Sequence, residues 1–148
     1  RLVRLLYKTL GNIIRMNKTE PYKSPDGQFK IELFYAGEIK FGPEYYSVAV
    51  NGHTIKEKLF GRPYKWDSES KYLALQEWLT TDYQKGPITA LLVIDLKENK
   101  ISRLSIAEKG FIKPIKFDGD KIIYNKEFSA SGQTIEYEID LKDVKNWV

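Results

Sequence analysis

Few of the residue types that usually perform catalysis are present in this chain. It has one histidine, His53, and no cysteine, which excludes a cysteine nucleophile and argues against a catalytic triad or a zinc site. His53 directly follows Asn51-Gly52, a pair that predicts a hairpin tip, where a histidine is normally solvated. We therefore expect no catalytic residue, no bound metal and no other cofactor.

Carboxylates beside aromatic residues form the one pattern that a hydrolase would use. Glu77 and Asp82 lie beside Trp78 and Tyr83, and a glycosidase needs two carboxylates lining an aromatic sugar cleft. No nucleophile elbow, phosphate-binding loop or complete calcium loop accompanies them. A structural role in a strand and its following loop is the simpler interpretation, so the chain is expected not to be an enzyme.

Two aromatic-rich segments are the best candidates for a binding surface. One spans residues 39–46, and the other is the segment 79–87 that follows Trp78. Tyrosine and tryptophan are typical interface anchors because they supply a large rigid surface with a polar tip. The alternative is that these rings fill the core. The predicted binding residues are Glu44, Tyr45, Tyr46, Glu77, Trp78, Asp82 and Tyr83.

The composition is that of a globular chain. Hydrophobic residues make up 42% and charged residues 30% of the 148 positions, which suits a single domain over residues 1–148. No apolar run approaches the length of a membrane span. The lack of cysteine favours a cytoplasmic location, and a periplasmic one stays open if a targeting segment is missing upstream.

The charge of the chain makes a nucleic-acid partner a weak hypothesis. Lysine and arginine number 24 against 20 aspartates and glutamates, which gives a net charge of +4. The lysines are scattered, whereas a nucleic-acid-binding protein usually concentrates its positive charge on one face. A mixed-charge surface is the simpler explanation.

One helix is predicted, at the N-terminus. Leu2, Leu6, Leu10 and Ile13 recur at the spacing of one helix face, so residues 2–16 are expected to form a helix packed on the sheet or its edge. A membrane-surface helix and a partner-binding helix are the alternatives.

From residue 22 onward, short apolar runs alternate with glycine, proline, asparagine and aspartate, which is typical of strands and turns. The run at 29–35 alternates with a period of two, and the last strand should place Ile135, Tyr137 and Ile139 on one face. The expected strands are residues 29–35, 46–50, 54–59, 71–78, 88–96, 100–104, 122–124, 127–128 and 134–141.

A repeated unit of an aromatic residue, a polar turn and a strand occurs at residues 22–31, 66–74 and 117–124, with a period of about 45 residues. Ile-Asp-Leu-Lys also recurs, at 94–97 and 139–142. Ser-Pro-Asp-Gly at 24–27 and the segment 66–74 resemble the W-S-P-D-G-K-x-L-A repeat of TolB-like and WD40-like β-propellers. This resemblance covers most of residues 22–144 and implies blade-like strand units.

About three such units are too few for a propeller ring, which usually needs four to eight blades. We therefore predict an all-β domain in which antiparallel meanders over residues 22–144 form an open or half-barrel sheet, together with the N-terminal helix. Edges left open in this way would be available to a partner.

The expected function is that of a non-enzymatic protein-binding module. The specific hypothesis is an inhibitor or immunity protein that neutralises a bacterial toxin enzyme by binding it. The first alternative is a fragment or relative of a TolB-like or prolyl-peptidase-like propeller domain, and the second is a weak nucleic-acid binder.

Overall fold

The computed structural model describes residues 22–148, which form ten strands and a short 3-10 helix. The helix predicted over residues 2–16 lies outside the described residues. The elements are β1 (Ile31–Glu38), β2 (Glu44–Val50), β3 (His53–Thr54), β4 (Leu59–Trp66), β5 (Tyr72–Trp78), β6 (Ile88–Asp95), β7 (Lys100–Glu108), β8 (Phe111–Asp118), β9 (Lys121–Phe128), β10 (Gln133–Asp140) and η1 (Leu141–Asp143).

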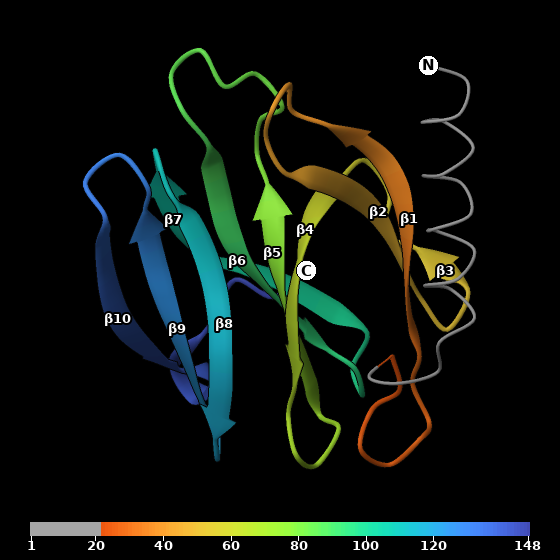
Figure 1. Cartoon of the computed structure of the whole chain (residues 1–148). Coiled ribbons are helices and arrows are strands. Elements are labelled where there is room, and N and C mark those ends of the chain that lie inside the picture. Colours follow the sequence, from red (N-terminus) through yellow and green to blue (C-terminus); the bar gives the residue numbers. More distant parts are fainter. Residues whose placement is uncertain (1–21) are drawn as a thin grey trace.

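The strands form two open antiparallel sheets. The larger sheet has the order β1-β2-β4-β5-β6-β7, with β3 added beside β2, and the smaller has the order β10-β9-β8. The smaller sheet lies against the larger one, and β8 contacts β4, β5, β6 and β7 (Figure 1). The predicted all-β class with antiparallel open sheets is confirmed. No helix in residues 22–148 has the length and apolar character needed to cross a membrane.

Most expected strands are present, and the turn at Asn51-Gly52 has positive φ at both residues, as its sequence predicts. The expected strand at 54–59 is wrong, because only β3 pairs there and Glu57, at φ 60°, turns the chain before β4 begins. The sequence pattern also misses β4 and β8. Pro114 interrupts β8, but it lies at a register shift in an edge strand, where proline is tolerated.

The hydrophobic core lies on both faces of β5 and β6. Leu75 and Leu92 pair across these strands and face the first cluster, whereas Leu91 and Val93 face the second, beneath the smaller sheet. Strands that are buried on both faces read as continuous apolar runs, which explains the sequence Leu91 to Ile94. The first cluster contains Ile31, Val48, Phe60, Leu73, Leu75, Leu92, Ile94 and Leu96, and the second contains Ala74, Leu91, Val93, Ala107, Ile112, Ile122, Tyr124 and Leu141.

Buried polar side chains join the two sheets. Gln76 Nε2 donates to the Ile112 carbonyl oxygen at 2.7 Å, and Trp78 Nε1 donates to Gln76 Oε1 at 2.8 Å. Thr89 Oγ1 accepts the Ile112 amide at 2.8 Å and donates to the Gly110 carbonyl at 3.0 Å. Gln76 of β5 and Thr89 of β6 thereby satisfy backbone amide and carbonyl groups at the start of β8. On the side that faces the larger sheet, no strand pairs with β8.

Gly61 gives the Gln76 side chain its space. Strand β4 pairs with β5 at Phe60 and again at Tyr64, so residues 61–63 bulge opposite the single residue Gln76. A Cβ atom at position 61 would lie 1.7 Å from Gln76 Oε1 and 2.9 Å from Trp78 Nε1. Any larger residue at position 61 must therefore displace the hydrogen bonds that hold the second sheet.

The double substitution of Gly61 and Gln76 tests this coupling. Gly61→Ala should lower the free energy of unfolding by about 1–3 kcal/mol through overpacking. Gln76→Ala should cost a similar ~1–3 kcal/mol, because the Ile112 carbonyl and the Trp78 indole lose their partner. Urea unfolding of the double variant should give a loss smaller than the sum, since the clash is gone. An additive loss would contradict the coupling.

Candidate binding site

Four aromatic rings meet at one end of the two sheets, where β5 runs into the loop at residues 79–87. Trp78 lies 5.3 Å from Tyr45, 5.6 Å from Tyr83 and 6.2 Å from Phe111, measured between ring centroids. Tyr83 and Phe111 are 6.3 Å apart. The turn between β1 and β2 and the loop between β5 and β6 reach this same end (Figure 1). The fold thus brings together Tyr45, Trp78 and Tyr83, three of the predicted binding residues.

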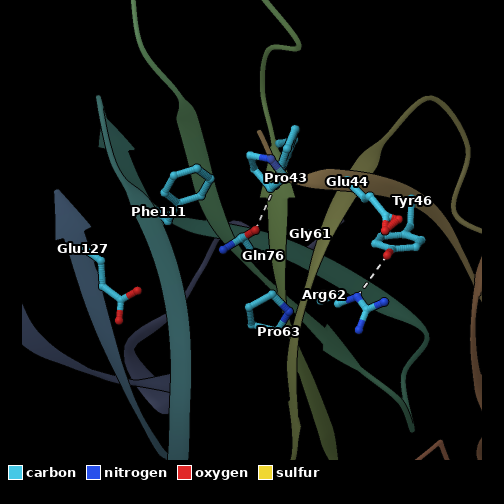
Figure 2. A pocket seen from close by; sticks show the side chains of 10 residues that line it. Pro43, Glu44, Tyr46, Gly61, Arg62, Pro63, Gln76, Phe111 and Glu127 are labelled. Carbon is cyan, nitrogen blue, oxygen red and sulfur yellow. Dashed lines mark hydrogen bonds between the residues drawn. The ribbon is translucent and has the colours of Figure 1, made fainter. Parts of the chain in front are cut away.

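A pocket of about 370 Å³ opens between the sheets beside these rings. Figure 2 shows Phe111 and Glu127 on one side, from β8 and β9, and Glu44, Tyr46 and Arg62 on the other, from β2 and β4. Apolar groups contribute most of its floor, and charged groups lie around it. The lining residues are Pro43, Glu44, Tyr46, Gly61, Arg62, Pro63, Gln76, Trp78, Phe111 and Glu127.

The bulge in β4 shapes this pocket. Its three residues, Gly61, Arg62 and Pro63, all line the cavity opposite Gln76. Arg62 Nε donates to Tyr46 Oη at 3.0 Å, which holds the guanidinium on one wall. Register pairing places Glu127 directly across from Phe111, so a carboxylate and an aromatic ring lie together on the opposite wall.

Glu77 points to the other face of β5 and has a structural environment. Its side chain is 3% exposed, and Oε1 and Oε2 accept from Arg103 Nε and Nη2 at 2.9 and 2.7 Å. Lys58 Nζ lies 3.2 Å from Oε2. The hydrogen bonds to Glu77 raise the pKa of Arg103 above its usual value. Two cations thus neutralise this carboxylate beneath the pocket rather than inside it.

The other predicted binding residues differ in exposure. Tyr46 and Trp78 are buried, Glu44, Tyr45 and Tyr83 are half-buried, and Asp82 is exposed. Asp82 organises its own loop, because its Oδ1 accepts the Gln84 amide at 3.0 Å. The buried rings thus lie beneath the surface at this end of the sheets, and the half-buried and exposed binding residues form that surface.

Sequence reasoning did not single out Arg62, Phe111 and Glu127, because they reach the pocket only through the β4 bulge and the packing of the second sheet. Phe41 is also absent from the predicted binding residues, although it lies inside the aromatic-rich segment 39–46. Its ring is 99% exposed, which makes it the most exposed of the large hydrophobic residues in the described chain.

Within residues 22–148, no three His, Asp or Glu side chains lie close enough to hold a metal ion. His53 is exposed in β3, at the hairpin tip that the sequence predicts. The chain matches no known family model, no curated protein and no solved structure. The propeller resemblance therefore stays a prediction.

Removal of the two cations beside Glu77, one at a time and then together, tests the role of its ion pairs. Lys58→Met and Arg103→Met each leave one cation beside the carboxylate, whereas the double variant leaves a buried charge uncompensated. We expect the double variant to lose about 3–5 kcal/mol of unfolding free energy, more than the sum of the single losses. Adding Glu77→Leu should recover stability. Additive losses, or no recovery, would contradict this role.

The Tyr83 hydroxyl predicts an effect at alkaline pH. It is buried without a hydrogen-bond partner within residues 22–148, and burial raises its pKa to about 12. Because an unfolded tyrosine titrates near 10, the folded state holds this proton more tightly, so stability falls as pH rises from 10 to 12. Tyr83→Phe should preserve stability at pH 7 and reduce that decline in pH-dependent unfolding experiments. An unchanged decline would contradict the assignment.

Proposed function

We propose that this chain is a non-enzymatic protein-binding module that holds its partner at the end formed by the β1–β2 turn, the β5–β6 loop and the pocket between the sheets. We call this surface the binding end, defined by residues 39–44, residues 79–87 and the pocket-lining side chains. The single observation that carries the proposal is the conformation and exposure of Phe41.

Phe41 occupies a position that is unfavourable for the free protein. Its ring is 99% exposed and its φ is 58°, a left-handed conformation that favours glycine. The Gly42 amide donates to the Ile39 carbonyl at 2.8 Å, which closes a turn with Phe41 at its third position. A left-handed phenylalanine costs about 1–2 kcal/mol, and the ring has the Lys40 Nζ 5.5 Å from its centroid but gains no burial in return. Burial of this ring against a partner would supply the missing favourable interaction.

The surroundings of Phe41 suit an interface anchor. Pro43, two residues later, lines the pocket, and Tyr45 packs on the buried Trp78. The hydrogen bonds of Gln76 fix Trp78 in turn. A surface held in this way loses little conformational freedom on binding, so more of the contact energy appears as affinity. The exposed Phe41 ring can therefore insert into a partner, and the rigid pocket beside it can receive a side chain of that partner.

We further propose that the partner is a bacterial toxin enzyme, which the chain neutralises as an inhibitor or immunity protein. An inhibitor of this kind acts by covering the active surface of its target, which requires a rigid anchor rather than catalytic groups. Glu127 at the pocket wall would favour a basic group on the target.

The glycine variant of Phe41 separates binding from folding. Glycine adopts a positive φ without strain, so Phe41→Gly should keep or raise the free energy of unfolding. Loss of an anchor ring should weaken partner binding by roughly 30-fold, the size expected of an interface hot spot. The assay is titration calorimetry with a candidate toxin enzyme, together with inhibition of that enzyme's activity.

Val148→Ala provides the matched control, because Val148 is also exposed but its backbone pairs with Ile101, near the start of β7. This variant should bind and inhibit like the original chain. Equal binding by the Phe41→Gly variant would refute the binding end. Tight binding without any loss of enzyme activity would refute the inhibitor function while leaving the binding module intact.

A further inference from the structure

A second candidate surface lies along the outer strand of the smaller sheet, where Thr134 pairs with Glu127 of the pocket wall at one end of β10. β10 pairs with β9 from Gln133↔Phe128 through Asp140↔Lys121 without a register shift. On its other side, no strand of residues 22–148 pairs with it, and Figure 1 shows it at the outer margin of the fold. A straight, uninterrupted edge of this kind is a template on which another strand can pair.

The backbone groups at this edge follow from the ladder. The Leu141 amide donates to the Asp120 carbonyl at 2.8 Å, and antiparallel ladders alternate between bonded and non-bonded pairs. The amides and carbonyls of Thr134, Glu136 and Glu138 therefore point away from β9. Protein edges are usually protected by lysine, proline or a bulge, and β10 has none of these. The opposite edge strand, β8, contains both Pro114 and a register shift.

The two faces of β10 differ in chemistry. Tyr137 stacks on the buried Tyr124 at 5.6 Å, and Lys126 Nζ lies 4.9 Å from the Tyr137 ring centroid, which secures the inner face. Glu136 and Glu138 project from the other face and are exposed. Glu138 lies 3.9 Å from Lys121, a distance and exposure typical of a weak surface pair. An acidic row thus borders the open backbone of a chain whose net charge is +4.

This acidic row argues against pairing with a second copy. In the symmetric antiparallel registers of β10 that overlap most and keep the faces matched, Glu136 would lie opposite Glu138 or opposite Glu136 itself. Like charges directly opposite each other destabilise a sheet. A strand that carries lysine or arginine at alternate positions would instead form favourable cross-strand pairs.

We propose that the free edge of β10 binds an extended segment of another protein with lysine or arginine at alternate positions. The segment adds a fourth strand to the smaller sheet, with its backbone bonded to Thr134, Glu136 and Glu138 and its cations beside the acidic row. Main-chain hydrogen bonds provide the affinity and charge pairing provides the selectivity. The proposed contacts along β10 do not involve Phe41, although Thr134 adjoins Glu127 of the pocket.

The probe for this site is a blocked heptapeptide of alternating threonine and lysine, titrated into the isotope-labelled full chain. Nuclear magnetic resonance should show peak shifts along β10, and the amides of Thr134, Glu136 and Glu138 should exchange roughly tenfold more slowly at saturation. Two control peptides should each bind roughly tenfold more weakly. One replaces lysine with glutamate, and the other is N-methylated at alternate residues, which blocks main-chain pairing.

Charge reversal completes the test. Glu136→Lys together with Glu138→Lys should reverse the preference, so that the glutamate peptide binds better than the lysine peptide. Glu98→Lys together with Glu108→Lys makes the same charge change at exposed positions elsewhere and should retain the original preference. Equal binding of the three peptides, protection outside β10, or reversal by the control variant would overturn the proposal. A dimer protected along β10 without peptide would also overturn it in favour of self-pairing.

Discussion

The hydrogen bonds from Gln76 and Thr89 to the backbone at the start of β8 hold the smaller sheet on the larger one. On the side that faces the larger sheet, no strand pairs with β8, and a buried unpaired amide or carbonyl would cost stability. The two side chains are 5% and 0% exposed, so both of these hydrogen-bonding groups are buried between the sheets. Position and register of the second sheet therefore depend on two polar residues within otherwise apolar strands.

The same network determines the shape of the binding end. The Gln76 amide requires Gly61 across from it, and the bulge at residues 61–63 opens the pocket beside that glycine. Gln76 also accepts from Trp78, the ring on which Tyr45 and Tyr83 pack. One buried side chain thus connects sheet packing, pocket geometry and the support of the surface residues.

The two proposed interaction surfaces rely on different physical contributions. At the binding end, an aromatic ring in an unfavourable conformation projects beside a rigid, mostly apolar pocket, so burial supplies the affinity. Along β10, open main-chain groups and a row of carboxylates favour an extended cationic segment. Glu77 belongs to neither surface, because Arg103 and Lys58 neutralise it on the far face of β5.

The sequence alone determined the all-β class, most of the strands, the Asn51-Gly52 turn and the face of β10 that carries Tyr137, because each follows from local periodicity or turn chemistry. The sequence also indicated that the segment 39–46 and the neighbourhood of Trp78 are the best candidates for a binding surface. Only the tertiary structure decided that both faces of β5 are buried, so that Glu77 meets Arg103 and Lys58 on one face and Trp78 packs against Tyr45 on the other. The tertiary structure likewise brought Arg62, Phe111 and Glu127 to one pocket, since long-range strand pairing and the β4 bulge leave no local pattern.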